Sequence, residues 1–117
     1  MYAEAIALSE QSLQNDPTSQ VQLGIIGYAY AKSGRRREAE GIIDRFREIA
    51  KTRYASPYWM AVIYAGLGEK DKAFAELERA FAELDWNVHR LQVDPLMDGV
   101  RDDRRRKDLL KRLRLPA

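Results

Sequence analysis

Apolar residues recur three or four positions apart through most of this chain, with polar residues between them. That spacing places the apolar side chains on one face of an α-helix. In residues 2–15, for example, Ala5, Leu8 and Leu13 share a face, and Pro17 disfavours helix just beyond. The same reasoning predicts helices over residues 18–33, 35–51, 56–67 and 69–84, short helices over 86–91 and 94–100, and a last helix from 102 or 103 to 113.

A second pattern is a repeat with a fixed period. The stretch from residue 27 to residue 34 recurs, residue type by residue type, from residue 61 to residue 68. A fixed period between about 20 and 50 residues is typical of repeat architectures. The sequence numbers differ by 34 in each matched pair, namely Gly27 and Ala61, Tyr30 and Tyr64, Gly34 and Gly68, and Ala39 and Ala73.

The matched residues predict a unit of helix, tight turn and helix. A small residue three positions before a Tyr shares its helix face and lets a second helix approach closely. The Gly that follows suits a helix C-terminus, because a left-handed conformation costs Gly little. Counting back 34 from Ala39 gives Ala5, so we expect the chain to open on the second half of a repeat and to be a fragment of a longer protein.

These units divide the chain into four parts. Residues 1–17 form the second helix of a truncated repeat, residues 18–51 and 52–85 form two repeats, and residues 86–117 form a closing segment. A terminal repeat needs a cover, because a stacked repeat cannot bury its own outer face. The residues expected to provide that cover are Trp86, Leu91, Val93, Leu96, Met97 and Val100.

The repeat resembles the tetratricopeptide repeat, which has a 34-residue period and the same order of small residue, aromatic, turn Gly and Ala. The match departs from the family at the repeat edges, where Leu23 and Pro57 replace an early Trp and only Pro17 keeps the exit Pro. The resemblance implies an all-α fold, a right-handed α-solenoid of antiparallel helix pairs with a C-terminal capping helix.

The closing segment has a second resemblance. Asp85-Trp86 and Asp94-Pro95-Leu96-Met97-Asp98 are similar to the end of bacterial multidomain proteins that carry these repeats behind a winged-helix regulator, a Ser/Thr kinase or a cyclase-like domain. In such proteins we would expect Pro, Phe and Gly where this chain has Arg104, Arg106 and Arg114. The resemblance implies a regulatory or scaffolding module of a larger protein.

The amino-acid composition excludes several kinds of functional site. The chain has no Cys and one His, so thiolate metal sites are absent and a zinc site is not expected at His89. We expect no cofactor and no enzymatic activity, because no nucleophile motif and no glycine-rich phosphate loop is present. No apolar run approaches the roughly 20 residues of a membrane span, and a cytoplasmic location is expected.

The expected function is therefore binding of another molecule at the protein surface. In such arrays the first helix of each pair lines the concave face. We predict that a peptide or protein binds there, with the two Tyr residues as the main contacts. The alternative is that these Tyr residues pack inside the groove. The predicted binding residues are Val21, Gly24, Tyr28, Lys32, Tyr58 and Val62.

Two alternatives remain. Residues 1–100 have a net charge of −3 and residues 101–117 a net charge of +5, so the last helix could bind nucleic acid or an acidic partner. Interleaved Asp residues and the absence of stacking aromatics argue against nucleic acid. The other alternative is a homodimer through an exposed face of the first helix, with Ile6, Leu8 and Leu13. The basic patch comprises Arg101, Arg104, Arg105, Arg106, Lys111 and Arg112.

Overall fold

The computed structural model describes residues 2–113 and is all-helical over that range, where no strand occurs. The predicted helices are confirmed, with ends that differ by at most a few residues; Arg114 and residues 115–117 lie outside the described range. The six α-helices and two 3-10 helices are α1 Tyr2–Asn15, α2 Gln20–Lys32, α3 Arg36–Ile49, α4 Pro57–Gly66, α5 Lys70–Ala82, η1 Trp86–Gln92, η2 Pro95–Val100 and α6 Arg104–Arg112.

Three of the helices end in the same way. In each, a residue just past the helix donates its N–H to a carbonyl five positions earlier, as in the bonds from Arg35 to Tyr30 (2.8 Å) and from Glu69 to Tyr64 (3.0 Å). The residue before the donor has a positive φ: 83° at Gly34 and 78° at Gly68, the two turn glycines of the repeat. The third helix, α5, is followed by Leu84 with a φ of 58°.

Several helix starts carry side-chain caps, among them α2, η1, η2 and α6. The Ser19 hydroxyl accepts from the N–H of Gln22 at the start of α2, and the Asp103 carboxylate accepts from the N–H of Arg105 at the start of α6. Ser56 lies at the N-cap of α4, but its hydroxyl donates to Asp85 (2.5 Å) instead of capping its own helix. The start of α4 is therefore tied to the end of α5.

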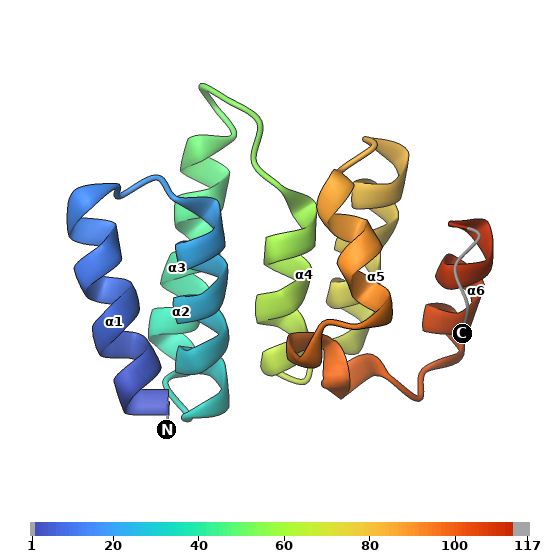
Figure 1. Ribbon diagram of the computed structural model, residues 1–117, viewed down its shortest axis with the longest axis horizontal. Coiled ribbons are helices and arrows are strands. Elements are labelled where there is room, and N and C mark those ends of the chain that lie inside the picture. Colours follow the sequence, from blue (N-terminus) through green and yellow to red (C-terminus); the bar gives the residue numbers. More distant parts are fainter. Residues whose placement is uncertain (1, 114–117) are drawn as a thin grey trace.

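The helices α1 to α5 stand side by side, and α6 stands at the far end from α1 (Figure 1). Helix α2 packs against α1, α3 and α4, while α4 packs against α2, α5 and η2. Every residue of α4 from Pro57 to Ala65 is buried. A helix that is apolar on all sides belongs in the interior, so α4 is the centre of the molecule.

Small residues make the close contact between α2 and α4. A Cβ added at Gly24 would lie 2.5 Å from Cε3 of Trp59, and one at Gly27 would lie 2.5 Å from Cδ1 of Ile63. These distances are far inside van der Waals contact, so the two glycines allow the Trp59 and Ile63 side chains to pack against the α2 backbone. The predicted role of Gly27 as a close-approach residue is confirmed.

The period of the repeat extends beyond the stretch in which the sequence showed it. Helices α1, α3, α5 and α6 begin at residues 2, 36, 70 and 104, each 34 after the last. Ala39 and Ala73 are fully buried at matching positions in α3 and α5. Between α5 and α6, where the period places a full helix, the chain forms η1 and η2.

The closing segment buries only part of its apolar residues. Leu91, Met97 and Val100 are buried, as the sequence predicted. The same prediction is wrong for Trp86 and Val93, which are 83% and 79% exposed. A 3-10 helix has three residues per turn, so it turns different side chains inward than an α-helix of the same sequence would. No helix within residues 2–113 is long and apolar enough to cross a bilayer.

Candidate binding surface

The predicted concave-face residues do not form one open surface. Gly24, Tyr58 and Val62 are buried, and this corrects the expectation that they would face a partner. The Tyr58 hydroxyl donates to Oδ2 of Asp94 (2.7 Å), and burial raises the pKa of that hydroxyl. Gly24 is covered by Trp59 of α4, and η2 packs across α4 on the side that the prediction left open.

The other predicted residues lie on α2 and remain at least partly accessible. Val21 and Lys32 are exposed, and Tyr28 is half-buried. The ring of Tyr28 meets the ring of Tyr2 edge-on at 6.4 Å between centroids, and burial raises the pKa of the Tyr28 hydroxyl.

Much of the predicted basic patch is engaged within the molecule. Arg105 forms ion pairs with Asp103 and Asp71, and its hydrogen bonds lower the pKa of Asp103 to about 2. Arg112 pairs with Glu78. In addition, Arg106 donates to the carbonyl of Gln92 and Arg101 pairs with Asp98. Arg104 and Lys111, by contrast, are exposed and form no ion pair with any residue that the structure describes.

The first helix does not present the apolar face that was expected to mediate a homodimer. Ile6 and Leu13 are buried in the core, which contradicts the expectation that they would be exposed. Leu8 alone of the three faces solvent, at 65% exposure. Because α1 packs along α2, its apolar stripe is already covered within this chain.

An apolar surface that the sequence did not indicate lies at the junction of α5, η1 and α6. A cavity of about 260 Å³ opens there. Two of its lining residues, Leu84 and Trp86, are the most exposed large apolar residues described, at 84% and 83%. The Trp86 ring lies 5.6 Å from the His89 ring. We call this surface the Trp86 patch; it comprises Phe81, Leu84, Trp86, Val88, His89 and Leu113.

The corresponding spaces between earlier helices contain charged side chains. In the groove between α1 and α3, Arg45 donates to the carbonyl of Pro17 (2.8 Å). Position 79, one repeat period later, carries an Arg that pairs with Glu76 and Glu83. Position 113, a further period on, is Leu113. The last junction therefore has an apolar residue where two earlier ones have a bridging guanidinium.

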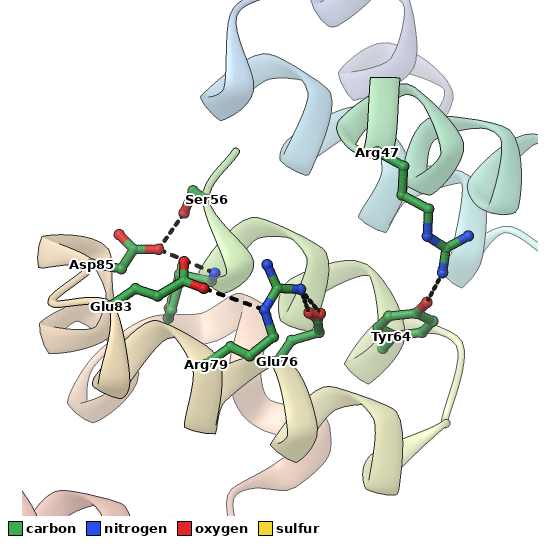
Figure 2. Close-up of polar contacts among 8 residues, drawn as sticks. Arg47, Ser56, Tyr64, Glu76, Arg79, Glu83 and Asp85 are labelled. Atoms are coloured by element: carbon green, nitrogen blue, oxygen red, sulfur yellow. Dashed lines mark hydrogen bonds and ion pairs between the residues drawn. The ribbon is translucent and has the colours of Figure 1, made fainter. Parts of the chain in front are cut away.

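Figure 2 shows how the polar contacts fill the space around α5. Arg79 lies between Glu76 and Glu83, and Arg47 reaches from α3 to the hydroxyl of Tyr64 (3.1 Å). Glu76 is buried, and that burial raises the pKa of its carboxyl, while Arg79 and Arg47 act in the opposite direction. Charged groups therefore occupy the groove between α3 and α5, unlike the Trp86 patch.

The floor of the Trp86 patch is held by a buried carboxylate. One oxygen of Asp85 accepts from the hydroxyl of Ser56 (2.5 Å) and from the N–H of Tyr58 (3.3 Å). The other accepts from the backbone and side-chain nitrogens of Asn87 (3.0 and 3.1 Å). The Ser56 bond is visible in Figure 2. A fully hydrogen-bonded carboxylate fixes the start of η1, and hence the backbone that carries Trp86, relative to α4.

One sequence signal pointed toward this surface without defining it. Trp86 and His89 are three residues apart outside the repeats, but the sequence predicts that Trp86 belongs to the buried cover. No group of His, Asp and Glu among residues 2–113 is arranged to hold a metal ion.

In comparisons with known proteins, no family model, no curated protein and no solved structure matches this chain.

Proposed function

We propose that this chain is a non-enzymatic helical-repeat module that binds a peptide or protein. In this proposal α1 to α6 form a right-handed solenoid of the tetratricopeptide type, and the module belongs to a larger bacterial regulatory protein in the cytoplasm. Support comes from the fixed period at which α1, α3, α5 and α6 begin and from the matched ends of α2 and α4. The small residues at the α2–α4 contact are a further match to that class.

The observation that carries the binding proposal is the Trp86 patch. Exposed apolar surface next to a concave site is typical of interaction surfaces, and Trp is enriched among the residues that dominate binding energy. Leu84 and Trp86 gain nothing for folding by being exposed, since an apolar side chain contributes to stability only when it leaves water. The proposed site therefore lies at this end of the molecule and not on the concave face of α2 and α4.

The first prediction tests this site. A library of random short peptides displayed on phage is selected against the 117-residue chain, and the selected peptides are measured by fluorescence anisotropy. We expect Trp86→Ala to weaken binding by roughly 30-fold, which corresponds to about 2 kcal/mol for an aromatic anchor. Val93→Ala is the matched control, because Val93 is equally exposed on the same segment but does not line the cavity.

Selection that yields no peptide bound more tightly by the unchanged chain than by Trp86→Ala would reject the proposal. Circular dichroism of both variants should match the unchanged chain, because neither side chain is buried. The two alternative functions have less support. The basic residues are largely paired within the molecule, and the apolar face of α1 is mostly covered.

A further inference from the structure

We infer that Leu115, which follows α6 in the sequence, inserts its side chain into the cavity of the Trp86 patch, so that a binding partner must displace it. The cavity contact stands on its own, whereas its effect on binding rests on the proposed function. Three features support the inference, namely the apolar lining of the cavity, the place where α6 ends, and the way in which the other helices of this chain end.

The cavity suits an uncharged, apolar occupant. Apolar groups that include Phe81 and Leu113 line it, and Leu84 and Trp86 lie at its opening. The one lining carboxylate, Asp85, already accepts four hydrogen bonds and does not require a charged partner. A cavity of about 150 Å³ lined by apolar groups holds a benzene molecule, so the 260 Å³ here admits a Leu side chain.

Helix α6 ends beside this cavity. Its C-cap residue is Leu113, which lines the cavity and donates its N–H to the carbonyl of Leu109 (2.9 Å). Leu109 and Leu110 are buried on the same side of the helix as Leu113, so this side faces the core and not solvent. A residue two positions beyond Leu113 lies within about 7 Å of it, because the chain extends at most about 3.6 Å per residue. Leu115 is therefore within reach of the cavity.

The residues that follow Leu113 include a suitable occupant. Residues 114–117, which lie outside the described range, have the sequence Arg-Leu-Pro-Ala. Leu115 is the large apolar residue of the four, and Pro116 disfavours helix for the residue before it. A Leu side chain that enters the cavity leaves water, and this transfer favours the contact.

The other helix ends of this chain show how such a residue is turned back toward its helix. After α2, α4 and α5, the residue two positions past the C-cap donates its N–H to a carbonyl five positions earlier. An apolar residue at that position commonly packs on the last turn of its helix. If α6 ends in the same way, Leu115 is turned back toward Leu110, on the side that carries Leu113. The matching residues after α2, α4 and α5 are Arg35, Glu69 and Asp85.

A residue of the same chain that fills the cavity lowers the apparent affinity for a partner. The apparent Kd rises as the fraction of molecules with an open cavity falls, so about tenfold is expected if roughly nine molecules in ten are closed. Arg114 occupies the position that Gly34 and Gly68 occupy after α2 and α4. A residue with a Cβ disfavours the positive φ of this ending, so the contact at α6 opens more readily than one with Gly would.

The contact itself is tested by NMR without a ligand. In a chain with labelled Leu methyl groups, we expect nuclear Overhauser effects between the Leu115 methyls and the ring protons of Trp86 or Phe81. Their absence would overturn the inference. A mixture of labelled and unlabelled chains separates contacts within one chain from contacts between two. Effects seen only between chains would assign the cavity to a second copy and would also overturn the inference.

The effect on binding is tested with peptides selected against the Leu115→Ser chain and measured by fluorescence anisotropy. We expect them to bind Leu115→Ser about tenfold more tightly than the unchanged chain, and Ala117→Ser with the affinity of the unchanged chain. Arg114→Gly should weaken binding, because Gly favours the positive φ of the closed ending. Arg114→Ala removes the same charge without that preference and should leave the affinity unchanged.

The outcomes separate this inference from the proposed function. If the peptides depend on Trp86 but bind Leu115→Ser and the unchanged chain equally, the proposed function stands and the inference is wrong. If Leu115 contacts the Trp86 or Phe81 ring but no peptide selected on Leu115→Ser depends on Trp86, the contact stands as part of the fold and the proposed function is wrong.

Discussion

Leu84 has a φ of 58° and lies one residue past the C-cap of α5, where Gly34 and Gly68 follow the ends of α2 and α4. The left-handed conformation costs a residue with a Cβ about 1–2 kcal/mol, and Gly avoids that cost. The Leu84 side chain is also 84% exposed, so it returns little packing energy. A strained and exposed Leu is poorly explained by stability, which supports a binding role for it.

Replacement of Leu84 by Gly is predicted to stabilise the fold. The relief of strain exceeds the larger conformational entropy that Gly loses on folding, so we expect a gain of about 0.5–1 kcal/mol in the free energy of unfolding. Urea denaturation followed by circular dichroism measures the change. Gly34→Ala is the matched comparison, since no atom lies within 4 Å of the added Cβ and only the positive φ of 83° opposes it. We expect Gly34→Ala to lower the free energy of unfolding by about 1 kcal/mol. A loss of stability in Leu84→Gly would contradict this account.

At the scale of elements, α6 is attached to α5 by two matched contacts rather than by close helix packing. Arg105 and Arg112 are two helical turns apart and therefore lie on one face. Each guanidinium lies over a ring of α5, Phe74 at 4.5 Å and Phe81 at 4.8 Å from the centroid. Each also pairs with an acidic residue of α5, Asp71 or Glu78 respectively.

We predict that Asp71→Asn combined with Glu78→Gln loosens α6 without unfolding the chain. Exposed ion pairs are individually weak and are screened by salt. Amide hydrogen exchange should therefore become severalfold faster in α6 and stay unchanged in α4, and high salt should produce the same change in the original chain. Asp44→Asn, which removes an ion pair internal to α3, is the control. Unchanged exchange in α6 after both treatments would show that apolar contacts alone hold the helix.

At the scale of the whole molecule, the contact between α2 and α4 joins the two halves. Helix α2 packs with α1 and α3, whereas α4 packs with α5 and η2. The contact depends on Gly24 and Gly27, which leave room for Trp59 and Ile63. Trp59 is almost completely buried, and the guanidinium of Arg90 lies 5.0 Å from its ring centroid. The ring therefore has little freedom to move away from a larger residue on α2.

Gly24→Ala is predicted to destabilise the whole chain, with Gly41→Ala as its control. Both substitutions gain about 1 kcal/mol of helix propensity, but only the first places a Cβ against a buried ring. The difference between their unfolding free energies should be about 1–3 kcal/mol, the usual cost of overpacking. Coincident transitions by fluorescence and circular dichroism would show that both halves unfold together. Equal stabilities for the two variants would mean that α2 and α4 separate easily.

The local features of this fold were readable from the sequence. Apolar spacing predicted each helix, and the turn glycines marked two helix ends. These features depend on a few neighbouring residues, because hydrogen bonds, caps and positive φ angles are set within one or two turns. The period of the repeat likewise indicated that Gly27 would allow a close helix contact.

Which side chains are exposed at the surface depends on the tertiary structure. The sequence placed Tyr58 on an open face and Trp86 in a buried cover, but η2 covers Tyr58 and the 3-10 geometry of η1 leaves Trp86 exposed. Periodicity tells which residues share a face of one helix, but not which later segment covers that face. Whether a side chain is buried depends on contacts between distant segments, and so does the candidate binding site of this chain.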